Sequence, residues 1–299
     1  MVRRDFLASA LAGSGLAAAQ SSSTEVTVER VSTGAPRRGQ ILALITPHLD
    51  DGPIFAGGTI AKLLKEGATG YFIRTSNDEK DSFRLSLGET VLANERDSAE
   101  MIRALGLEKV FDLSYRNHRM DDVAPTELRA RLVFLFRLLK VDIVFSYDPW
   151  GHYEENPDHY VTARAVEAAC WMSGGGLDLP EHFAAGLKPH SVREKYYFAR
   201  GPQLVNRVVD IAATRETKTA AIRACKTMIH HMVKDLETTL AERKLRLPNL
   251  SEDEYIKFAF DQRDHNVGQK QGVEYAEEFH YIGPDENLER LIRQNAVPL

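Results

Sequence analysis

The fold is decided by one stretch, QILALITPHLDDGPIFAGGTIAKLLK, at positions 40–65. It opens with an apolar run at 41–45, whose length and composition are typical of a strand buried on both faces. Polar and acidic residues then replace the run abruptly. Because Pro53 suits the first position of a helix and Asp51 or Gly52 its N-cap, we expect a helix to begin at Pro53. The stretch therefore predicts a strand, a tight turn and a helix.

Three side chains in that turn can bind a metal or transfer a proton: His48, Asp50 and Asp51. Open α/β sheets bind their ligands at the carboxyl ends of parallel strands, which is where this turn is expected. The His-x-x-Asp spacing lets His48 and Asp51 converge on one divalent ion, since zinc accepts neutral imidazole and carboxylate ligands. Asp50 then points elsewhere and stays free to take a proton. The alternative is that both acidic residues only cap the helix and that His48 is an ordinary loop residue.

A second polar cluster, YDPWGHYEENPDH at 147–159, also follows an apolar run, at 141–145. The arrangement repeats the first one: a buried strand, a polar loop and a helix. His159 opens that helix, so its imidazole can face the strand ends. The inner face of the helix is expected to carry Val161, Ala165, Ala168 and Met172. His48, Asp51 and His159 would then supply three ligands and leave one position open, which is the pattern of a hydrolytic zinc centre.

Several motifs occur in order along positions 40–201: PHLDDG, AGGTIAKL, TSNDEK, NERDSAEMIRALGL and NPDH. They resemble the PIG-L/LmbE-like deacetylases, whose usual forms are a PHPDDE-type first motif and an HPDH-type second motif. The resemblance implies that His48, Asp51 and His159 are the zinc ligands and that Asp50 is the general base. It also implies that Asp158 supports the ligands from the next layer of side chains.

Two positions depart from the family pattern. Gly52 stands where the family usually has Glu, and Asn156 stands where it usually has a His that polarises the carbonyl or steadies the tetrahedral intermediate. An asparagine side chain can donate a hydrogen bond to an oxyanion but cannot act as an acid at neutral pH. Our hypothesis is that Asn156, His152 or Tyr153 replaces the missing imidazolium. The alternative is an impaired or altered enzyme.

The composition bounds the class of protein. At 299 residues, the chain can hold one large α/β domain, or one domain with an appended helical segment. Its 43% hydrophobic and 27% charged residues are ordinary for a globular protein, and a net charge of −5 gives no reason to expect a nucleic-acid partner. Cys170 and Cys225 fall on predicted inner helix faces, so we expect buried free thiols rather than a disulfide.

The N-terminus has the pattern of an export signal. Arg3 and Arg4 precede a mildly apolar stretch that ends in three alanines at 17–19, which is typical of a twin-arginine signal peptide with a small-residue cleavage site. We therefore expect a signal peptide at 1–19, a lead at 20–39 and the deacetylase domain at 40–299. The protein would be periplasmic or extracellular. The stretch is too short and too rich in glycine for a stable membrane span.

Strand and helix patterns alternate along the first two thirds of the chain. Strands are expected at 71–73, 110–113 and 194–199, with a possible edge strand at 25–30, and helices with inner residues Leu92 to Leu105 and Leu128 to Leu139. This alternation needs right-handed crossovers. It predicts a Rossmann-like three-layer α/β/α fold with a mainly parallel sheet. No G-x-G-x-x-G motif follows any of these strands.

The last third of the chain is predicted to be a C-terminal helical extension. One long helix is expected through 222–240, and a shorter one at 255–260 with Phe258 facing inward. His265 and His280 lie in this part of the chain, and we expect structural or surface roles for them.

These observations predict a zinc-dependent hydrolase that removes an N-acetyl group from an N-acetylated amino sugar or its conjugate. Asp50 would take a proton from water and pass it to the leaving amine, and Asn156 and His152 are further catalytic candidates. Other divalent transition metals suit the same ligands. The alternatives are a metal-containing carbohydrate-binding or pseudoenzyme module, and a zinc amidase that acts on another sugar conjugate. The expected partner is a small amino-sugar substrate, and the sequence leaves the oligomeric state open.

Overall fold

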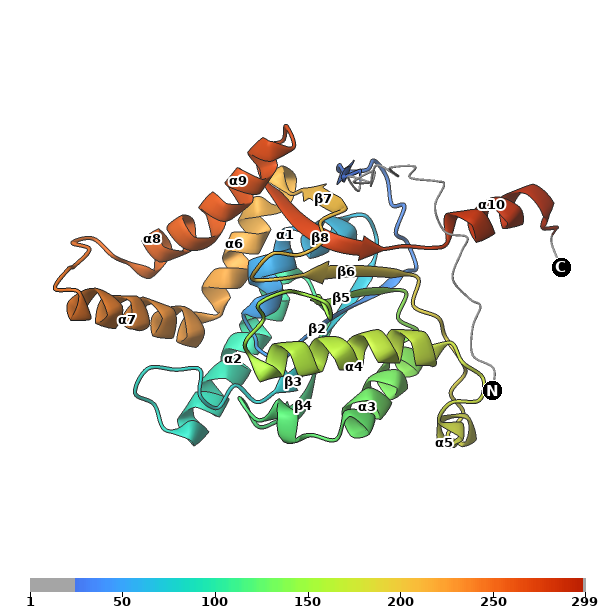
Figure 1. Ribbon diagram of the computed structural model, residues 1–299, viewed down its shortest axis with the longest axis horizontal. Helices are drawn as coiled ribbons and strands as arrows, with labels where there is room; N and C mark the ends of the chain where they lie inside the picture. The colour runs from blue at the N-terminus through green and yellow to red at the C-terminus, as the bar shows by residue number, and fades with distance from the viewer. Residues whose placement is uncertain (1–24, 298–299) are drawn as a thin grey trace, which may run out of the picture.

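The computed structural model describes residues 25–297, which contain one eight-stranded sheet with helices on both faces (Figure 1). The strand order is β1-β7-β8-β6-β5-β2-β3-β4. The strands are β1 (Thr27–Glu29), β2 (Ile41–Thr46), β3 (Thr69–Ser76), β4 (Lys109–Tyr115), β5 (Ile143–Tyr147), β6 (Glu194–Phe198), β7 (Arg207–Asp210) and β8 (Ala276–Ile282). All neighbouring strands are parallel except where β8 pairs with β6 and β7. The prediction of a mainly parallel sheet is confirmed.

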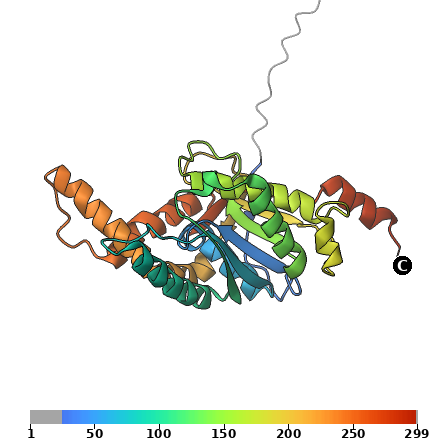
Figure 2. The same cartoon turned by 90° about the horizontal axis from the view of Figure 1, so that it is seen from below.

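Helices connect the parallel strands and fill the last third of the chain. Between β2 and β6 these are α1 (Asp51–Lys65), α2 (Leu87–Leu105), the short η1 (Met120–Asp122), α3 (Pro125–Leu139), α4 (Pro157–Ser173) and α5 (Pro180–Ala184). After β7 they are η2 (Ala212–Thr214), α6 (Arg215–Ala224), α7 (Lys226–Glu242), α8 (Glu252–Ile256), the π-helical turn η3 (Lys257–Asp261), α9 (Gln262–Lys270) and α10 (Glu286–Asn295). Figure 2 shows α7 and α10 projecting at opposite ends of the molecule.

The sheet separates two hydrophobic cores, because successive side chains of a strand point to opposite faces. Leu42 and Leu44 of β2 pack on one side with α1, α2 and α6. Ala43 and Ile45 pack on the other side with α3 and α4. All four side chains are fully buried. The apolar run at 41–45 is therefore buried on both faces, as the sequence predicts, and this fixes the polar turn after it at the carboxyl edge of the sheet.

Helix α1 begins earlier than the sequence predicts. Asp50 occupies the N-cap position and Asp51 the first helical position, so Pro53 is the third residue of the helix and not the first. Proline is tolerated there because the N–H groups of the first turn have no partner within the helix. The Asp50 side chain makes no capping hydrogen bond, which removes the alternative that it only caps the helix.

The prediction of one long helix through 222–240 is wrong, because the chain breaks at Cys225 into α6 and α7. Asp97 of α2 accepts a hydrogen bond of 2.6 Å from the backbone N–H of Thr227 in the first turn of α7. A carboxylate distant in sequence thus caps the second helix and stabilises the break.

The C-terminal part is not purely helical, since it adds β7 and β8 to the sheet. Phe258 was expected to face inward, but its side chain is 80% exposed. The π-helical turn at Lys257–Asp261 places extra backbone in the helix and changes which residues face the core. Leu92 of α2 is also exposed, because Ala93, Met101 and neighbouring residues form the buried face.

Further predictions from the sequence concern the two ends of the chain and the cysteines. The signal peptide predicted at 1–19 lies outside the described residues. In the predicted lead, β1 pairs with β7 at the edge of the sheet. Cys170 and Cys225 are buried free thiols in the described part of the chain, as predicted. No helix within residues 25–297 is long and apolar enough to cross a membrane.

Candidate metal centre

The two polar turns meet because β2 and β5 are neighbours. Leu42 pairs with Ile143 and Leu44 with Phe145, so both strands end at the same edge of the sheet. The turn after β2 carries His48 into α1. The loop after β5 leads to Asn156, whose side-chain Oδ1 accepts from Asp158 N at 3.0 Å and so caps α4. His159 lies in the first turn of that helix and faces the end of β2.

The three predicted ligands converge on one point. His48 Nδ1 lies 3.0 Å from His159 Nε2. Asp51 Oδ2 lies 3.4 Å from His48 Nδ1, and Asp51 Oδ1 lies 3.6 Å from His159 Nε2. The three side chains are buried, and their ligand atoms all lie within 4.8 Å of one another. Two imidazoles and one carboxylate at such distances fit a zinc-type ligand set.

Neighbouring groups orient each of these ligands. Asp158 Oδ2 lies 3.2 Å from His48 Nε2, which favours a proton on that nitrogen and leaves Nδ1 with its lone pair. Glu154 Oε1 lies 3.1 Å from His159 Nδ1, at an angle outside hydrogen-bond geometry. Its charge favours a proton on Nδ1 and so leaves His159 Nε2 with its lone pair. Tyr147 donates a hydrogen bond of 2.6 Å to Asp51 Oδ1. Two ring nitrogens with facing lone pairs repel each other unless a cation or a proton lies between them, so the arrangement fits a metal ion.

The charge on Asp51 is held by the two imidazoles. Although burial opposes its ionisation, His159 and His48 hold the pKa of Asp51 at about 2. Asp50 differs from it, because burial and the adjacent Asp51 charge raise the pKa of Asp50 well above its ordinary value. Asp50 Oδ1 is buried and has no hydrogen-bond partner among the described residues. Asp50 is therefore a carboxyl group that no other side chain engages and that is poised to hold a proton.

A cavity of about 240 Å³ opens beside these groups. The three ligand candidates and Asp50 line it, together with other polar side chains that include Asp81, His118, Asn156 and Arg200. Its apolar lining consists of Ile54, Phe55, Met228, Met232 and Phe260. The cavity thus joins a polar, metal-binding end to a hydrophobic wall that comes mostly from the C-terminal helices.

Of the three residues proposed to replace the missing histidine, only Asn156 lines the cavity. Asn156 lines the cavity, and its Nδ2 lies 3.3 Å from His159 Nε2. His152 is exposed and is not among the residues that line this cavity, and Tyr153 is 87% exposed. His118 instead brings an imidazole to the cavity, with its ring 6.2 Å from that of His48.

Sequence reasoning missed several of these residues. His118 lies in the loop after β4, and its backbone N–H donates a hydrogen bond of 2.7 Å to Asp158 Oδ2, a contact that the sequence does not indicate. Tyr147 and Glu154 lie inside the second cluster, but nothing in their spacing indicates which ligand each supports. Arg200 lies far along the chain and pairs with Glu154 through Nε at 3.1 Å.

Gly52, the other departure from the family pattern, has a packing explanation. A Cβ atom built on Gly52 would lie 2.2 Å from Leu44 Cδ2, far closer than two carbon atoms can approach. The Leu44 side chain fills the space next to this position, so any larger residue at 52 would displace it from the core.

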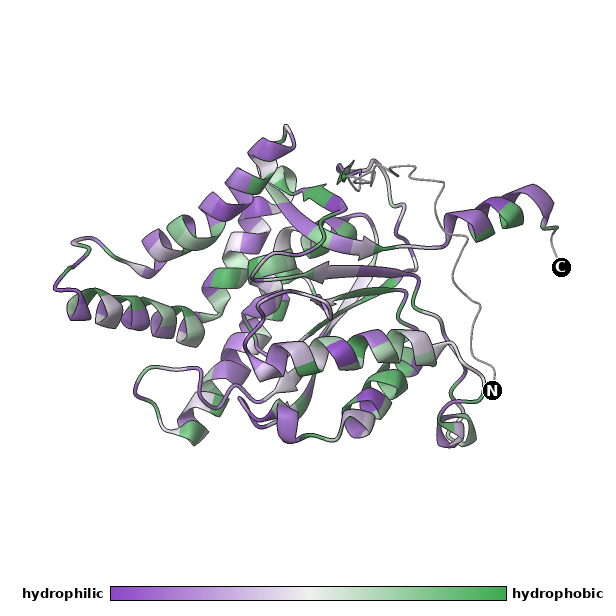
Figure 3. Cartoon of the chain, viewed as in Figure 1, coloured by the Kyte–Doolittle hydropathy of each residue, from purple (hydrophilic) through white to green (hydrophobic). Residues whose placement is uncertain are grey.

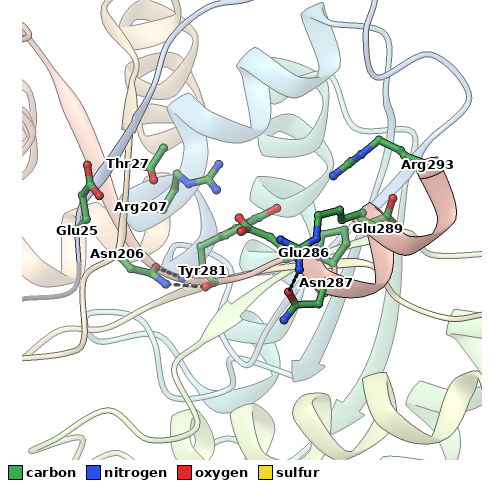
Figure 4. Close-up of a pocket in the computed structure, with 12 residues that line it drawn as sticks. Glu25, Thr27, Asn206, Arg207, Tyr281, Glu286, Asn287, Glu289 and Arg293 are labelled. Atoms are coloured by element: carbon green, nitrogen blue, oxygen red, sulfur yellow. Dashed lines mark hydrogen bonds between the residues drawn. The ribbon is translucent and has the colours of Figure 1, made fainter. Parts of the chain in front are cut away.

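A second acidic group lies next to this centre, and a larger cavity lies away from it. His48, Asp78 and Asp81 form a second acidic group, in which Asp78 Oδ2 accepts a hydrogen bond of 2.9 Å from Arg74. A larger cavity of about 750 Å³ is lined by β1, β7, the end of β8 and α10 (Figure 4). Because β8 is antiparallel to the other strands, its end lies at the opposite edge of the sheet from the metal centre.

Comparisons with known proteins agree with this geometry. The sequence model of the PIG-L family, described as GlcNAc-PI de-N-acetylase, matches residues 43–170. A diacetylchitobiose deacetylase of Thermococcus kodakarensis is 32% identical over 191 residues, which cover 60% of this chain and 66% of that protein, slightly less than two thirds of its length. A 1D-myo-inositol 2-acetamido-2-deoxy-alpha-D-glucopyranoside deacetylase of Mycobacteroides abscessus is 25% identical over 229 residues, which cover 63% of this chain and 81% of that protein.

A solved deacetylase structure has a similar fold. The N,N'-diacetylchitobiose deacetylase of Pyrococcus horikoshii, in complex with an inhibitor, superposes with a TM-score of 0.67 and 25% sequence identity. The superposition covers 82% of this chain and 84% of that one. Residues 43–170 thus match the PIG-L family, and the chain has the fold of a diacetylchitobiose deacetylase.

Proposed function

We propose that this protein is a metal-dependent hydrolase that removes the acetyl group from an N-acetylated amino sugar or its conjugate. The observation that carries the proposal is the convergence of His48, Asp51 and His159 beside Asp50, a carboxyl group that no other side chain engages, in one cavity. The relatives named as deacetylases of acetylated amino sugars support the reaction class. Zinc is the preferred metal because two imidazoles and a carboxylate with an open position form a hydrolytic zinc set.

When bound, the cation would polarise the amide carbonyl and make a water molecule more acidic. Asp50 then takes a proton from the attacking water and later passes it to the nitrogen as the amide C–N bond breaks. Acetate and the free amine are the products. The raised pKa of Asp50 suits both steps, because burial and the adjacent Asp51 charge let this carboxyl group hold a proton more readily than an ordinary aspartate does.

Asn156 has the position of an oxyanion donor in this proposal. Its Oδ1 is used by the α4 cap, so its Nδ2, which carries two protons and lies 3.3 Å from His159 Nε2, is the atom that can donate toward the cavity. A neutral amide N–H can stabilise the developing charge but cannot supply a proton, which leaves Asp50 as the acid for the leaving amine. Asn156→Ala should lower kcat about 100- to 1,000-fold with the metal content unchanged. An unchanged kcat would exclude Asn156 from this role.

Acetate release from N-acetylglucosamine, diacetylchitobiose and an N-acetylglucosaminyl-inositol tests the reaction, with metal content measured on the same samples. The proposal predicts acetate release that stops on chelation and returns with zinc. His48→Ala should lose both metal and activity, whereas His265→Ala, which changes a partly exposed histidine outside the cavity, should keep both. Saccharide binding without any acetate release would favour a carbohydrate-binding module instead. Acetate release from none of these sugars but from another conjugate would keep the chemistry and change the substrate.

We also propose that the protein acts outside the cytoplasm, on the basis of the Arg3-Arg4 motif and the apolar stretch after it. Replacing both arginines with lysine should retain the protein in the cytoplasm of the producing cell. Cell fractionation with an antibody checks this, and unchanged export would contradict a twin-arginine route.

A further inference from the structure

Arg200 brings a guanidinium group to the cavity at the metal centre. It is the only lysine or arginine among the described residues that line this cavity. Arg200 lies two residues after β6, whose Phe198 pairs with Tyr147 of β5, so it lies at the same carboxyl edge of the sheet as the metal ligands. Unlike an imidazole, a guanidinium group keeps its positive charge throughout the physiological pH range.

The carboxylate of Glu154 holds Arg200 next to Asn156. Arg200 donates from Nε to Glu154 Oε2 at 3.1 Å and from Nη2 to Glu154 Oε1 at 2.5 Å. The backbone N–H of Asn156 donates to the same Oε1 at 3.0 Å. The two-point contact fixes the plane of the guanidinium group. Arg200 Nη1 makes no hydrogen bond to another described residue, so its N–H groups remain available to a ligand.

The loop that carries Arg200 packs against the loop that carries Glu154. The backbone N–H of His152 donates to the carbonyl oxygen of Pro202 at 3.4 Å. A Cβ atom built on Gly201 would lie 3.1 Å from the carbonyl oxygen of His152, so the two backbones approach closely there. Both ends of the ion pair are therefore anchored, although the Arg200 side chain is 42% exposed. A donor that is held in place before the reaction needs no rearrangement when charge develops.

The apolar lining of the cavity strengthens the effect of a fixed charge. Met228 and Met232 of α7 line the cavity together with Phe260. Figure 3 shows hydrophobic residues recurring along α7. Apolar side chains exclude water and lower the local dielectric constant, so a charge acts more strongly there than in solution.

We propose that Arg200 is a catalytic residue that supplies the positive charge of the missing histidine, because its guanidinium group donates to the tetrahedral oxyanion beside Asn156. The inference rests on the proposed deacetylase function and adds a residue to it. As the water oxygen bonds to the carbonyl carbon, the C=O π electrons move to the carbonyl oxygen and one water proton passes to Asp50. The C=O bond forms again as the C–N bond breaks, and Asp50 gives the proton to the nitrogen. Arg200 gains and loses no proton, and it stabilises the charge that exists only between these two steps.

Two substitutions at this position test the proposal. Arg200→Gln removes the charge and keeps a side chain of similar reach. With zinc-loaded full-length protein and N-acetylglucosamine or diacetylchitobiose, kcat for acetate release should fall about 100-fold, as for the loss of one oxyanion donor. KM and the zinc Kd should stay at their wild-type values. Arg200→Lys keeps the charge, so its kcat should be at least about tenfold higher than that of Arg200→Gln. Equal losses of kcat in the two variants would overturn the proposal.

A purely structural role of Arg200 gives a different result. If Arg200 acts only by holding Glu154 beside His159, Arg200→Gln should weaken zinc binding by about 10- to 100-fold, and full zinc loading should restore kcat. That outcome would also overturn the proposal. Arg116→Gln is the matched control, because Arg116 donates to Glu79 at 2.9 Å and lies outside the cavity lining. The control should keep the kcat of the wild type.

Restoring the family's histidine provides an independent test. In an Asn156→His background, an imidazole again lies at this position, so the loss of kcat on Arg200→Gln should be at least about tenfold smaller than in the wild-type background. Equal losses in two backgrounds that both hold zinc would contradict the assignment of this charge to Arg200. If Asn156→His does not hold zinc, the comparison of Arg200→Gln with Arg200→Lys decides alone.

Failure of the inference and failure of the proposed function give different results. Acetate release that Arg200→Gln leaves unchanged would overturn the inference and leave the deacetylase intact. If the wild type releases no acetate, calorimetry with a methylphosphonamidate analogue of N-acetylglucosamine decides, because its phosphoryl oxygens carry the charge of a tetrahedral oxyanion. Binding that is about 100-fold weaker in Arg200→Gln would support the oxyanion role although the proposed substrates fail. Equal binding in both proteins, or no binding, would overturn both proposals.

Discussion

Removing the hydroxyl group of Tyr147 should weaken metal binding without disturbing the packing of the site. Tyr147 is 2% exposed, and its hydroxyl group donates the 2.6 Å hydrogen bond to Asp51 Oδ1. Its ring stacks on His159 with the centroids 4.1 Å apart and an angle of 17° between the planes. Tyr147→Phe keeps the stacking and removes only the hydrogen bond.

Two magnitudes follow from this geometry. A hydrogen bond to a charged group contributes about 1.5–3 kcal/mol, so the metal-free variant should be less stable by that amount. Residues that orient a metal ligand typically change metal affinity by about 10- to 100-fold when they are removed. We therefore expect a zinc Kd that is higher by this factor in Tyr147→Phe, measured by competition with a fluorescent chelator, together with a lower midpoint of urea unfolding for the metal-free protein.

Tyr197→Phe is the matched control for this experiment. Tyr197 is another fully buried tyrosine of the sheet, and its hydroxyl group donates to the carboxylate of Glu167 on the α4 side. The control should lose stability but keep the zinc affinity of the wild type. Equal zinc affinity in wild type, Tyr147→Phe and Tyr197→Phe would refute the reasoning, because Asp51 would then not be a ligand that Tyr147 orients.

Three further predictions concern stability. Gly52→Ala should lower the free energy of unfolding by about 1–3 kcal/mol, because the added methyl group overpacks against Leu44. The loss should be smaller in a Leu44→Ala background. Equal losses in the two backgrounds, measured by urea unfolding, would contradict the packing explanation. Lys218→Met should lower the free energy of unfolding by about 3–5 kcal/mol, because Lys218 Nζ lies 2.7 Å from buried Glu277 and its loss leaves that carboxylate without this ion pair. A loss below about 1 kcal/mol would show that the ion pair does not hold the C-terminal part in place. Burial raises the pKa of Asp81 from 3.8 to about 7, so the folded metal-free protein keeps a proton that the unfolded chain has lost, and stability falls as the pH rises through that window. In Asp81→Asn the free energy of unfolding should fall by up to about 4 kcal/mol less than in the wild type over this pH range. The same pH profile of unfolding in variant and wild type would contradict the assignment of this proton to Asp81.

The sequence predicts the centre of the fold well because the signals there are local. The apolar run at 41–45 has the length and composition of a buried strand, and the polar turn follows directly from its end. The same holds for the second cluster, so the meeting of His48 and His159 follows once β2 and β5 are neighbours. Gly106 also ends α2 in the left-handed conformation, which glycine adopts readily at the end of a helix.

The features that the sequence did not predict depend on distant partners. The break at Cys225 is stabilised by Asp97, and β8 is a strand because β6 and β7 lie on either side of it. Phe258 has the spacing of a core residue, but the π-helical turn moves it to the surface. Spacing likewise cannot indicate that Tyr147 supports Asp51, since the contact joins residues 96 positions apart.

Acetate release by zinc-loaded Asp50→Asn, measured with metal content on the same sample, tests the central claim most directly. Asp50 is not one of the three converging ligands, so the variant should bind as much zinc as the wild type. General-base catalysis typically contributes about 100- to 10,000-fold, and turnover should fall by that factor. Wild-type turnover in a fully zinc-loaded Asp50→Asn protein would contradict the account.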